Sequence, residues 1–260
     1  MAELNGVAAD VDQVKALALT NYGHFTSMRV EDGHVRGLSL HLDRLMRDCR
    51  RVFDADLDPE RVRHLVRRVV ADINQPIIVR VTAFDPALEL GHPGTDAVPQ
   101  ILVTTRPAAQ APLPGLRLQS ATYRRDMPEV KHVGLFGSLR LRRMAQRNGF
   151  DDALFTDGDA VISEAATSNI GFVDGARVVW PQAEWLPGVT MRLINQTRDE
   201  HVATAPLRLA ELSEIDAVFA TNAAVGVRPV NAIDDAHWPG DHPTLRALRK
   251  QYEDIPPERL

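Results

Sequence analysis

The stretch FDDALFTDGDAVISEAATSNIGFVDGARVV, residues 150–179, decides the fold of the second half of this chain. It contains two turn signals, Asp157-Gly158 and Asp174-Gly175, each between apolar runs, and this pattern predicts two successive β-hairpins. Glu164 and Asn169 fall between the two turns. Side chains alternate along a strand, so Glu164 is expected to point to one face, in the middle of a predicted sheet.

Further elements are predicted on both sides of that stretch. Upstream, the pattern favours a strand at 116–122 and a helix ending near Gly149; downstream, it favours a helix beginning at 187–190, a short helix near 207–214 and a strand at 217–221.

The first half alternates strand and helix patterns. A hairpin is predicted at Asp32-Gly33, and helices are predicted at about 40–53 and 59–73, the second with Asp58 as N-cap and Pro59 in its first turn. Strands are predicted at 76–83 and 100–105. Residues 106–115 contain three prolines and predict an extended connector. We therefore place one domain at 1–105 and another at 116–260.

Composition limits the partners of the protein. The chain has 260 residues, a net charge of −5 and no long basic run, which argues against nucleic-acid binding. No apolar stretch approaches the roughly 18 residues of a membrane span, so a soluble, cytoplasmic protein is expected. Cys49, the only cysteine, lies at an apolar helical spacing and is expected in a core. The histidine spacing predicts no metal site, and no phosphate-loop, dinucleotide or nucleophile-elbow motif occurs.

Lysine is scarce in this chain. Only Lys15, Lys131 and Lys250 occur, and 27 of the 30 basic residues are arginine. A lysine amine can form a Schiff base with an aldehyde, and it does so more readily when it is withdrawn from water. Lys131 precedes Glu164 by about thirty residues, and a carboxylate can keep the ring nitrogen of a cofactor protonated. These two residues are predicted to be catalytic.

Seven segments, in order along the chain, carry a family resemblance: Tyr22–Arg29, His41–Leu45, Val130–His132, Phe150–Phe155, Glu164 with Asn169, Leu186–Thr190, and Thr221–Ala223 with Arg228–Val230. Together they resemble the class IV aminotransferases, the fold type IV pyridoxal-phosphate enzymes that include branched-chain and D-amino-acid aminotransferases and aminodeoxychorismate lyase. The resemblance covers roughly residues 20–231. It implies an α+β fold of two domains, a smaller N-terminal α/β domain and a larger C-terminal domain with a mixed sheet.

The resemblance also implies roles. Lys131 would bind pyridoxal 5'-phosphate covalently and remove the Cα proton of the substrate, and Glu164 would face the pyridine nitrogen. Arg44 would bind the phosphate, because a guanidinium can hold two oxygens. The remaining cofactor-binding residues would be Asn169, the helix start at Gly188, Val189 and Thr190, whose amides suit an anion, and the loop at Asn222 and Ala223.

Departures from the family pattern leave the reaction open. Branched-chain aminotransferases usually have a tyrosine where this chain has Phe136 and a threonine where it has Ala223. Aminodeoxychorismate lyases usually follow Lys-His with polar residues, whereas Gly134 and Leu135 stand here. Three hypotheses remain: an aminotransferase moving an amino group from an amino acid or amine to a keto acid, an aminodeoxychorismate lyase releasing pyruvate and 4-aminobenzoate, and a cofactor-binding homologue without turnover.

Substrate contacts are predicted at Phe25, Met28, Arg80 and Phe136, of which Arg80 could meet a substrate carboxylate. Members of the resembling family place the active site beside a second subunit, so the resemblance implies a homodimer.

Overall fold

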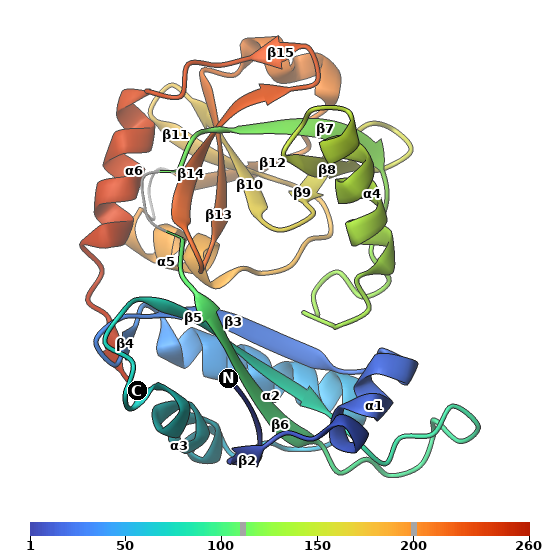
Figure 1. The fold of residues 1–260 in the computed structure, drawn as a ribbon. Coiled ribbons are helices and arrows are strands. Elements are labelled where there is room, and N and C mark those ends of the chain that lie inside the picture. The colour runs from blue at the N-terminus through green and yellow to red at the C-terminus, as the bar shows by residue number, and fades with distance from the viewer. Residues whose placement is uncertain (110–112, 199–201) are drawn as a thin grey trace. The chain divides into compact units, whose positions relative to one another are not determined.

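The computed structural model describes residues 1–109, 113–198 and 202–260 (Figure 1). The chain divides into two compact units. Unit 1 comprises Met1–Ala109, Val130–Gly134 and Pro256–Leu260, and unit 2 comprises Gln110–Glu129 and Leu135–Ile255. Residues 110–112 of the expected connector 106–115 lie outside the described residues. The domain boundaries drawn from the sequence therefore stay a prediction.

Unit 1 is built on a five-stranded antiparallel sheet in the order β2-β1-β6-β5-β3. Its strands are β1 (Ala2–Leu4), β2 (Val7–Ala8), β3 (His24–Val30), β5 (Ile77–Phe84) and β6 (Gln100–Pro107). A separate pair joins β4 (His34–Val35) to β16 (Glu258–Arg259). The expected turn at Asp32-Gly33 connects β3 to β4, and both residues have positive φ angles of 49° and 71°. Aspartate and glycine suit such a turn because they tolerate the left-handed region.

Three helices belong to unit 1: α1 (Val11–Thr20), α2 (Leu38–Phe53) and α3 (Pro59–Val70). The two predicted from the sequence are confirmed, and α3 ends three residues before the expected position. The Asp58 carboxylate accepts a hydrogen bond from the Glu60 amide, and Pro59 occupies the first turn, as the sequence predicts. Cys49 is fully buried on α2, so its expected packing role is confirmed, and burial raises the pKa of its thiol to about 11.

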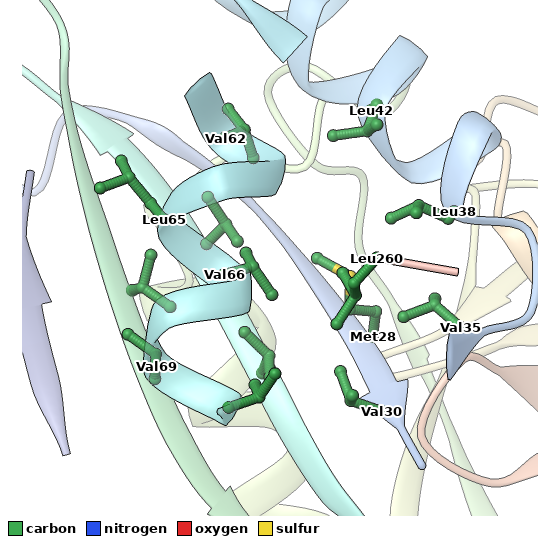
Figure 2. Packing of buried hydrophobic residues seen from close by; sticks show 14 of the residues in the cluster. Met28, Val30, Val35, Leu38, Leu42, Val62, Leu65, Val66, Val69 and Leu260 are labelled. Carbon is green, nitrogen blue, oxygen red and sulfur yellow. The ribbon is translucent and has the colours of Figure 1, made fainter. Parts of the chain in front are cut away.

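The core of unit 1 lies between α2, α3 and the sheet. Figure 2 shows Val62, Leu65, Val66 and Val69 of α3 at helical spacing along this core. Leu260 packs into the same cluster and is only 4% exposed. Leu260 therefore shares one core with residues from the first half of the chain. Burial of each of these side chains contributes about 1.5–3 kcal/mol.

Unit 2 contains a nine-stranded mixed sheet. The order is β12-β11-β10-β13-β14-β7-β8-β9, with β15 paired to β14. The strands are β7 (Leu116–Thr122), β8 (Asp152–Thr156), β9 (Ile162–Ala165), β10 (Asn169–Asp174), β11 (Arg177–Pro181), β12 (Val202–Ala205), β13 (Ala217–Asn222), β14 (Gly226–Ile233) and β15 (Ala236–His237).

The two Asp-Gly hairpins of the opening stretch are confirmed as β8-β9 and β10-β11. One expectation is wrong: Glu164 lies on β9, which ends the strand order and does not stand in the middle of the sheet. Each hairpin pairs correctly, but local sequence does not specify how successive hairpins join into one sheet.

The helices of unit 2 are α4 (Phe136–Arg147), α5 (Val189–Thr197), a 3₁₀ helix (Leu209–Glu214) and α6 (Pro243–Glu253). Helix α4 packs on β7 and β8, and α6 packs on β14 and α5. Among the described residues, no helix is both long enough and apolar enough to cross a membrane.

Candidate active site

Lys131 lies in a short segment of unit 1 whose backbone is bonded on both sides. Its carbonyl accepts a hydrogen bond from the Phe25 amide of β3 at 2.8 Å, and its own amide donates to the Asp48 carboxylate of α2 at 3.0 Å. Two residues later, the Val133 amide donates to the carbonyl of Gly23 at 2.9 Å. The predicted lysine is thus held against β3 and α2 by its main chain.

Phe25 brings Lys131 and Arg80 to one aromatic ring. In the β3-β5 register Phe25 stands opposite Thr82, so Arg80, two residues away on β5, is its diagonal neighbour on the same face. The Arg80 guanidinium carbon lies 3.6 Å from the Phe25 ring centroid, and the Lys131 Nζ lies 4.9 Å from it. Both distances suit a cation–π interaction. Burial lowers the pKa of Arg80 from its usual value.

Arg44 is buried in the same unit, at 4% exposure. Its Nη2 donates to the Thr26 hydroxyl at 2.5 Å, and that hydroxyl lies 2.7 Å from the Nδ1 of His41. Burial, followed by the nearby charges of Arg44 and Lys131, lowers the pKa of His41 well below 6.5. A neutral imidazole can accept a hydrogen bond from the Thr26 hydroxyl. The arginine predicted to bind phosphate is thus oriented by two polar side chains.

Glu164 forms a buried ion pair in unit 2. Its Oε1 accepts a hydrogen bond from the Nε of Arg125 at 2.8 Å, and its Oε2 accepts one from the Leu186 amide at 3.2 Å. The Glu164 residue is 7% exposed. Arg125 also donates to the carbonyl of Pro128. These contacts fix the carboxylate itself in place.

Asn169 links β10 to the residues that precede α5. Its side-chain amide donates to the carbonyl of Leu186 at 2.7 Å. A Cβ at Gly188 would stand only 2.0 Å from the Asn169 Oδ1, so position 188 accepts only glycine while Asn169 keeps this orientation. Glu164, Asn169 and Gly188 therefore gather around one backbone segment, as their joint assignment requires.

The first turn of α5 offers polar groups to an anion. Gly188 is the N-cap residue of α5, and no side-chain hydrogen bond caps the helix. Val189 and Thr190 are its first two residues. The hydroxyls of Thr190 and Thr221 are buried and have no hydrogen-bond partner among the described residues. A helix N-terminus with an unused hydroxyl is suited to a phosphate. The residues present here thus fit the phosphate of the cofactor that the sequence implies.

Asn222 and Ala223 follow β13. The Asn222 side chain donates to the Ser168 hydroxyl at 3.0 Å and accepts from the amides of Ala224 and Val225. Asn222 thereby shapes the loop that begins at Ala223, which has only backbone to offer. The β10-β13 register sets Asn169 opposite Thr221, beside this loop.

The other two predicted substrate residues, Met28 and Phe136, belong to different units. Met28 has no exposed surface and packs in the core of unit 1 (Figure 2). We therefore leave it out of the functional assignment. Phe136 begins α4 and is 79% exposed.

The sequence analysis missed Asp48, Thr26 and Arg125. Asp48 could have been found, because it lies four residues after Arg44 on one helix and shares its face. Thr26 lies between His24 and Met28 on its face of β3, and Arg125 stands outside regular structure. No local pattern distinguishes these two.

A family model described as amino-transferase class IV matches residues 23–233 of this chain. The protein belongs to the class IV aminotransferase family. Among curated relatives, a probable branched-chain-amino-acid aminotransferase of Rickettsia bellii is 30% identical over 121 residues, which are 44% of this chain and 42% of that protein. In the first four such relatives, the matched region spans between 42% and 53% of their length.

Solved structures confirm the mixed α and β fold type. A hypothetical aminotransferase from Mycobacterium tuberculosis in a PLP-bound form superposes with a TM-score of 0.82 at 16% identity, covering 98% of both chains. A putative 4-amino-4-deoxychorismate lyase from Legionella pneumophila gives 0.80 at 22% identity, covering 96% of both.

Proposed function

We propose that this protein is a pyridoxal-phosphate-dependent aminotransferase, which moves an amino group from an amino acid or amine to a keto acid. One observation supports Lys131 as the residue that binds the cofactor. Of the three lysines, Lys15 and Lys250 are exposed, and Lys131 alone is partly withdrawn from solvent. A lysine that bonds to the cofactor and then acts as a base must be nucleophilic near neutral pH, which favours partial desolvation.

The cofactor would supply an electron sink that stabilises the negative charge left when the Cα proton departs. Lys131 would hold the cofactor covalently and carry that proton on its Nζ. Glu164, fixed by Arg125 and the Leu186 amide, would keep a proton on the ring nitrogen. Arg44 and the first turn of α5 would bind phosphate oxygens. The assignment of residues from both units to one cofactor rests on the family pattern.

On the substrate side, Arg80 is the group we assign to a carboxylate. A guanidinium binds a carboxylate through two parallel hydrogen bonds, and partial burial strengthens them by excluding water. Phe25 packs under both Arg80 and Lys131, so it would hold the two cations on a common wall. Substrates with a free carboxylate are therefore favoured over simple amines. Phe136 would join this set beside a second subunit, in a homodimer that acts in the cytoplasm.

Aminodeoxychorismate lyase activity is the second candidate. It is favoured by Phe136, which has no hydroxyl where branched-chain enzymes have a tyrosine, and by His132 after the lysine. The lyase reaction would use the same proton transfer by Lys131 but release pyruvate without an acceptor.

The first experiment is the visible absorption spectrum of the purified protein with added pyridoxal phosphate, followed by borohydride reduction. We expect wild type and Lys15→Ala to form a reducible adduct and Lys131→Ala to form none, with activity lower by on the order of 10³-fold. A reducible adduct in Lys131→Ala would refute the assignment. Product formation that requires a keto acid then identifies an aminotransferase, whereas pyruvate release without an acceptor identifies the lyase.

A further inference from the structure

We propose that Asp48 is a positioning residue for the reaction, which sets the direction of the Lys131 side chain by holding the Lys131 backbone amide. The inference rests on the proposed role of Lys131 and adds a residue to which no role has been assigned. Its basis is the direct hydrogen bond from the Lys131 amide to the Asp48 Oδ2, at 3.0 Å.

Asp48 is fully buried, and both of its oxygens are used. The Oδ1 accepts two hydrogen bonds from Arg47, at 2.7 Å from Nη2 and 3.0 Å from Nε, while the Oδ2 accepts from Lys131. A buried carboxylate costs several kcal/mol of desolvation, and an apolar side chain of similar volume would often be as stable or more so. Fold stability alone therefore gives little reason for a carboxylate at this position.

The bond acts on the part of Lys131 that determines where its amine points. The carbonyl of Lys131 is already held by the Phe25 amide, and the backbone of Val133 by Gly23. Asp48 holds the remaining polar group of the Lys131 backbone. With both peptide groups fixed, the direction of the Cα–Cβ bond is set, and less conformational freedom remains to be lost when the side chain is ordered.

Helix α2 carries both this contact and the proposed phosphate ligand. Arg44 and Asp48 are four residues apart, so they lie one above the other on the same face of the helix. One rigid helix thus holds the backbone of Lys131 and the proposed phosphate ligand Arg44 at a fixed separation. Such coupling favours Asp48 over a loop residue as the lysine's support.

The test compares Asp48→Ala with Asp48→Asn in the full-length protein. The alanine variant loses the acceptor, whereas the asparagine variant keeps an oxygen that can accept from the Lys131 amide. A hydrogen bond to a charged acceptor changes an equilibrium or a rate by about tenfold. One to a neutral acceptor has roughly half that free energy, which corresponds to about threefold. Asp43→Ala is the control, because Asp43 is an exposed carboxylate on the same helix.

Four quantities are measured: hydrogen exchange of the 130–134 peptide, the rate of borohydride-reducible attachment of added pyridoxal phosphate, kcat and KM. For Asp48→Ala we expect exchange about tenfold faster, attachment and kcat about tenfold slower, and KM nearly unchanged. For Asp48→Asn we expect these changes to be limited to about threefold. Asp43→Ala should behave as wild type.

Wild-type exchange and attachment in Asp48→Ala would overturn the inference, as would equal losses in both Asp48 variants. If Asp48→Ala does not fold, Asp48→Asn decides the question: it must retain the protection of the 130–134 peptide and attach the cofactor within about threefold of wild type. The proposed function fails separately, if Lys131→Ala still forms the reducible adduct.

Discussion

The two clusters of functional residues hold their key side chains in different ways. In unit 1 hydrogen bonds with Asp48 and the Phe25 amide hold the main chain of Lys131, and its Nζ lies 4.9 Å from the Phe25 ring centroid. In unit 2 the hydrogen bonds fall on the functional group itself, because Arg125 and the Leu186 amide bind the carboxylate of Glu164.

The difference matches what each group has to do. A lysine that bonds to a cofactor must later release it and carry a proton. Its amine must therefore move, while its backbone stays fixed. A carboxylate that faces a ring nitrogen needs one orientation throughout the reaction. If this comparison is correct, substitutions at the two clusters should have different effects. Removal of a single functional group should destabilise unit 2 more strongly than unit 1.

The largest effect is expected for Glu164→Leu. The Arg125 side chain is 9% exposed, and removing one partner of a largely buried ion pair costs up to about 3–5 kcal/mol. We expect the free energy of unfolding, measured in denaturant, to fall by that amount, and cofactor binding to weaken.

Glu184→Ala is the matched control, since Glu184 pairs with Arg124 at the exposed surface and should cost less than about 1 kcal/mol. Equal effects at positions 164 and 184 would contradict the view that unit 2 fixes its carboxylate by a buried pair.

The second prediction compares the acid sensitivity of the two units. Burial lowers the pKa of His24 to about 4, and nearby Asp48 opposes this only in part. Because the unfolded chain binds a proton near pH 6.5 and the folded one near 4, stability is lost as the pH falls through this window, by up to about 3 kcal/mol. His41 acts in the same direction. In unit 2, burial raises the pKa of Asp152, which has the opposite effect because the folded state then binds the proton first.

Hydrogen exchange between pH 6.5 and 4 should therefore accelerate in unit 1 before unit 2, beyond the intrinsic pH dependence of exchange. The fluorescence of Trp180, Trp185 and Trp238, all in unit 2, should change last. His24→Gln should reduce the acid sensitivity, whereas the exposed His64→Gln should not. If unit 2 lost its protection from hydrogen exchange before unit 1 as the pH falls, the predicted difference between the two units would be wrong.

The smallest effect is expected for Gly188→Ala. The added Cβ would overlap the Asn169 side chain, which must then move and lose its bond to the Leu186 carbonyl. Overpacking of this kind costs about 1–3 kcal/mol. Thermal unfolding and the affinity for pyridoxal phosphate measure it, with Gly158→Ala as control because a Cβ there meets nothing within 4 Å. An unchanged affinity would separate Gly188 from phosphate binding.

Much of the fold follows from local sequence. Asp58-Pro59 predicts the start of α3, and the Asp-Gly pairs predict both hairpins of unit 2, because each signal acts over a few residues. Helix α1 was not predicted, although Asp10 and Gln13 form a capping box at its start; it has no buried residues, and Val14 and Leu17 are only partly buried. The place of β9 at the end of the sheet also could not be predicted, because strand order depends on long-range pairing.

For the candidate site, the sequence indicated the functional residues by their type, but it did not indicate which residues hold them in place. Scarcity made Lys131 a candidate, and the spacing of Glu164 to Lys131 and Asn169 did the same for Glu164. The partners that hold them, Asp48 and Arg125, are common residue types, and they acquire meaning only when folding brings distant segments together.

The buried position of Leu260 bears on the order in which unit 1 is made and packed during synthesis. It packs in the core of unit 1 with residues such as Met28, and β16 pairs with β4. The strands of the N-terminal sheet emerge early during synthesis, which proceeds at about 5–20 residues per second. Unit 1 must nevertheless wait for residues 130–134 and 256–260 before its packing is complete. Within this chain, the sheet of unit 1 is therefore made before the residues that complete its packing.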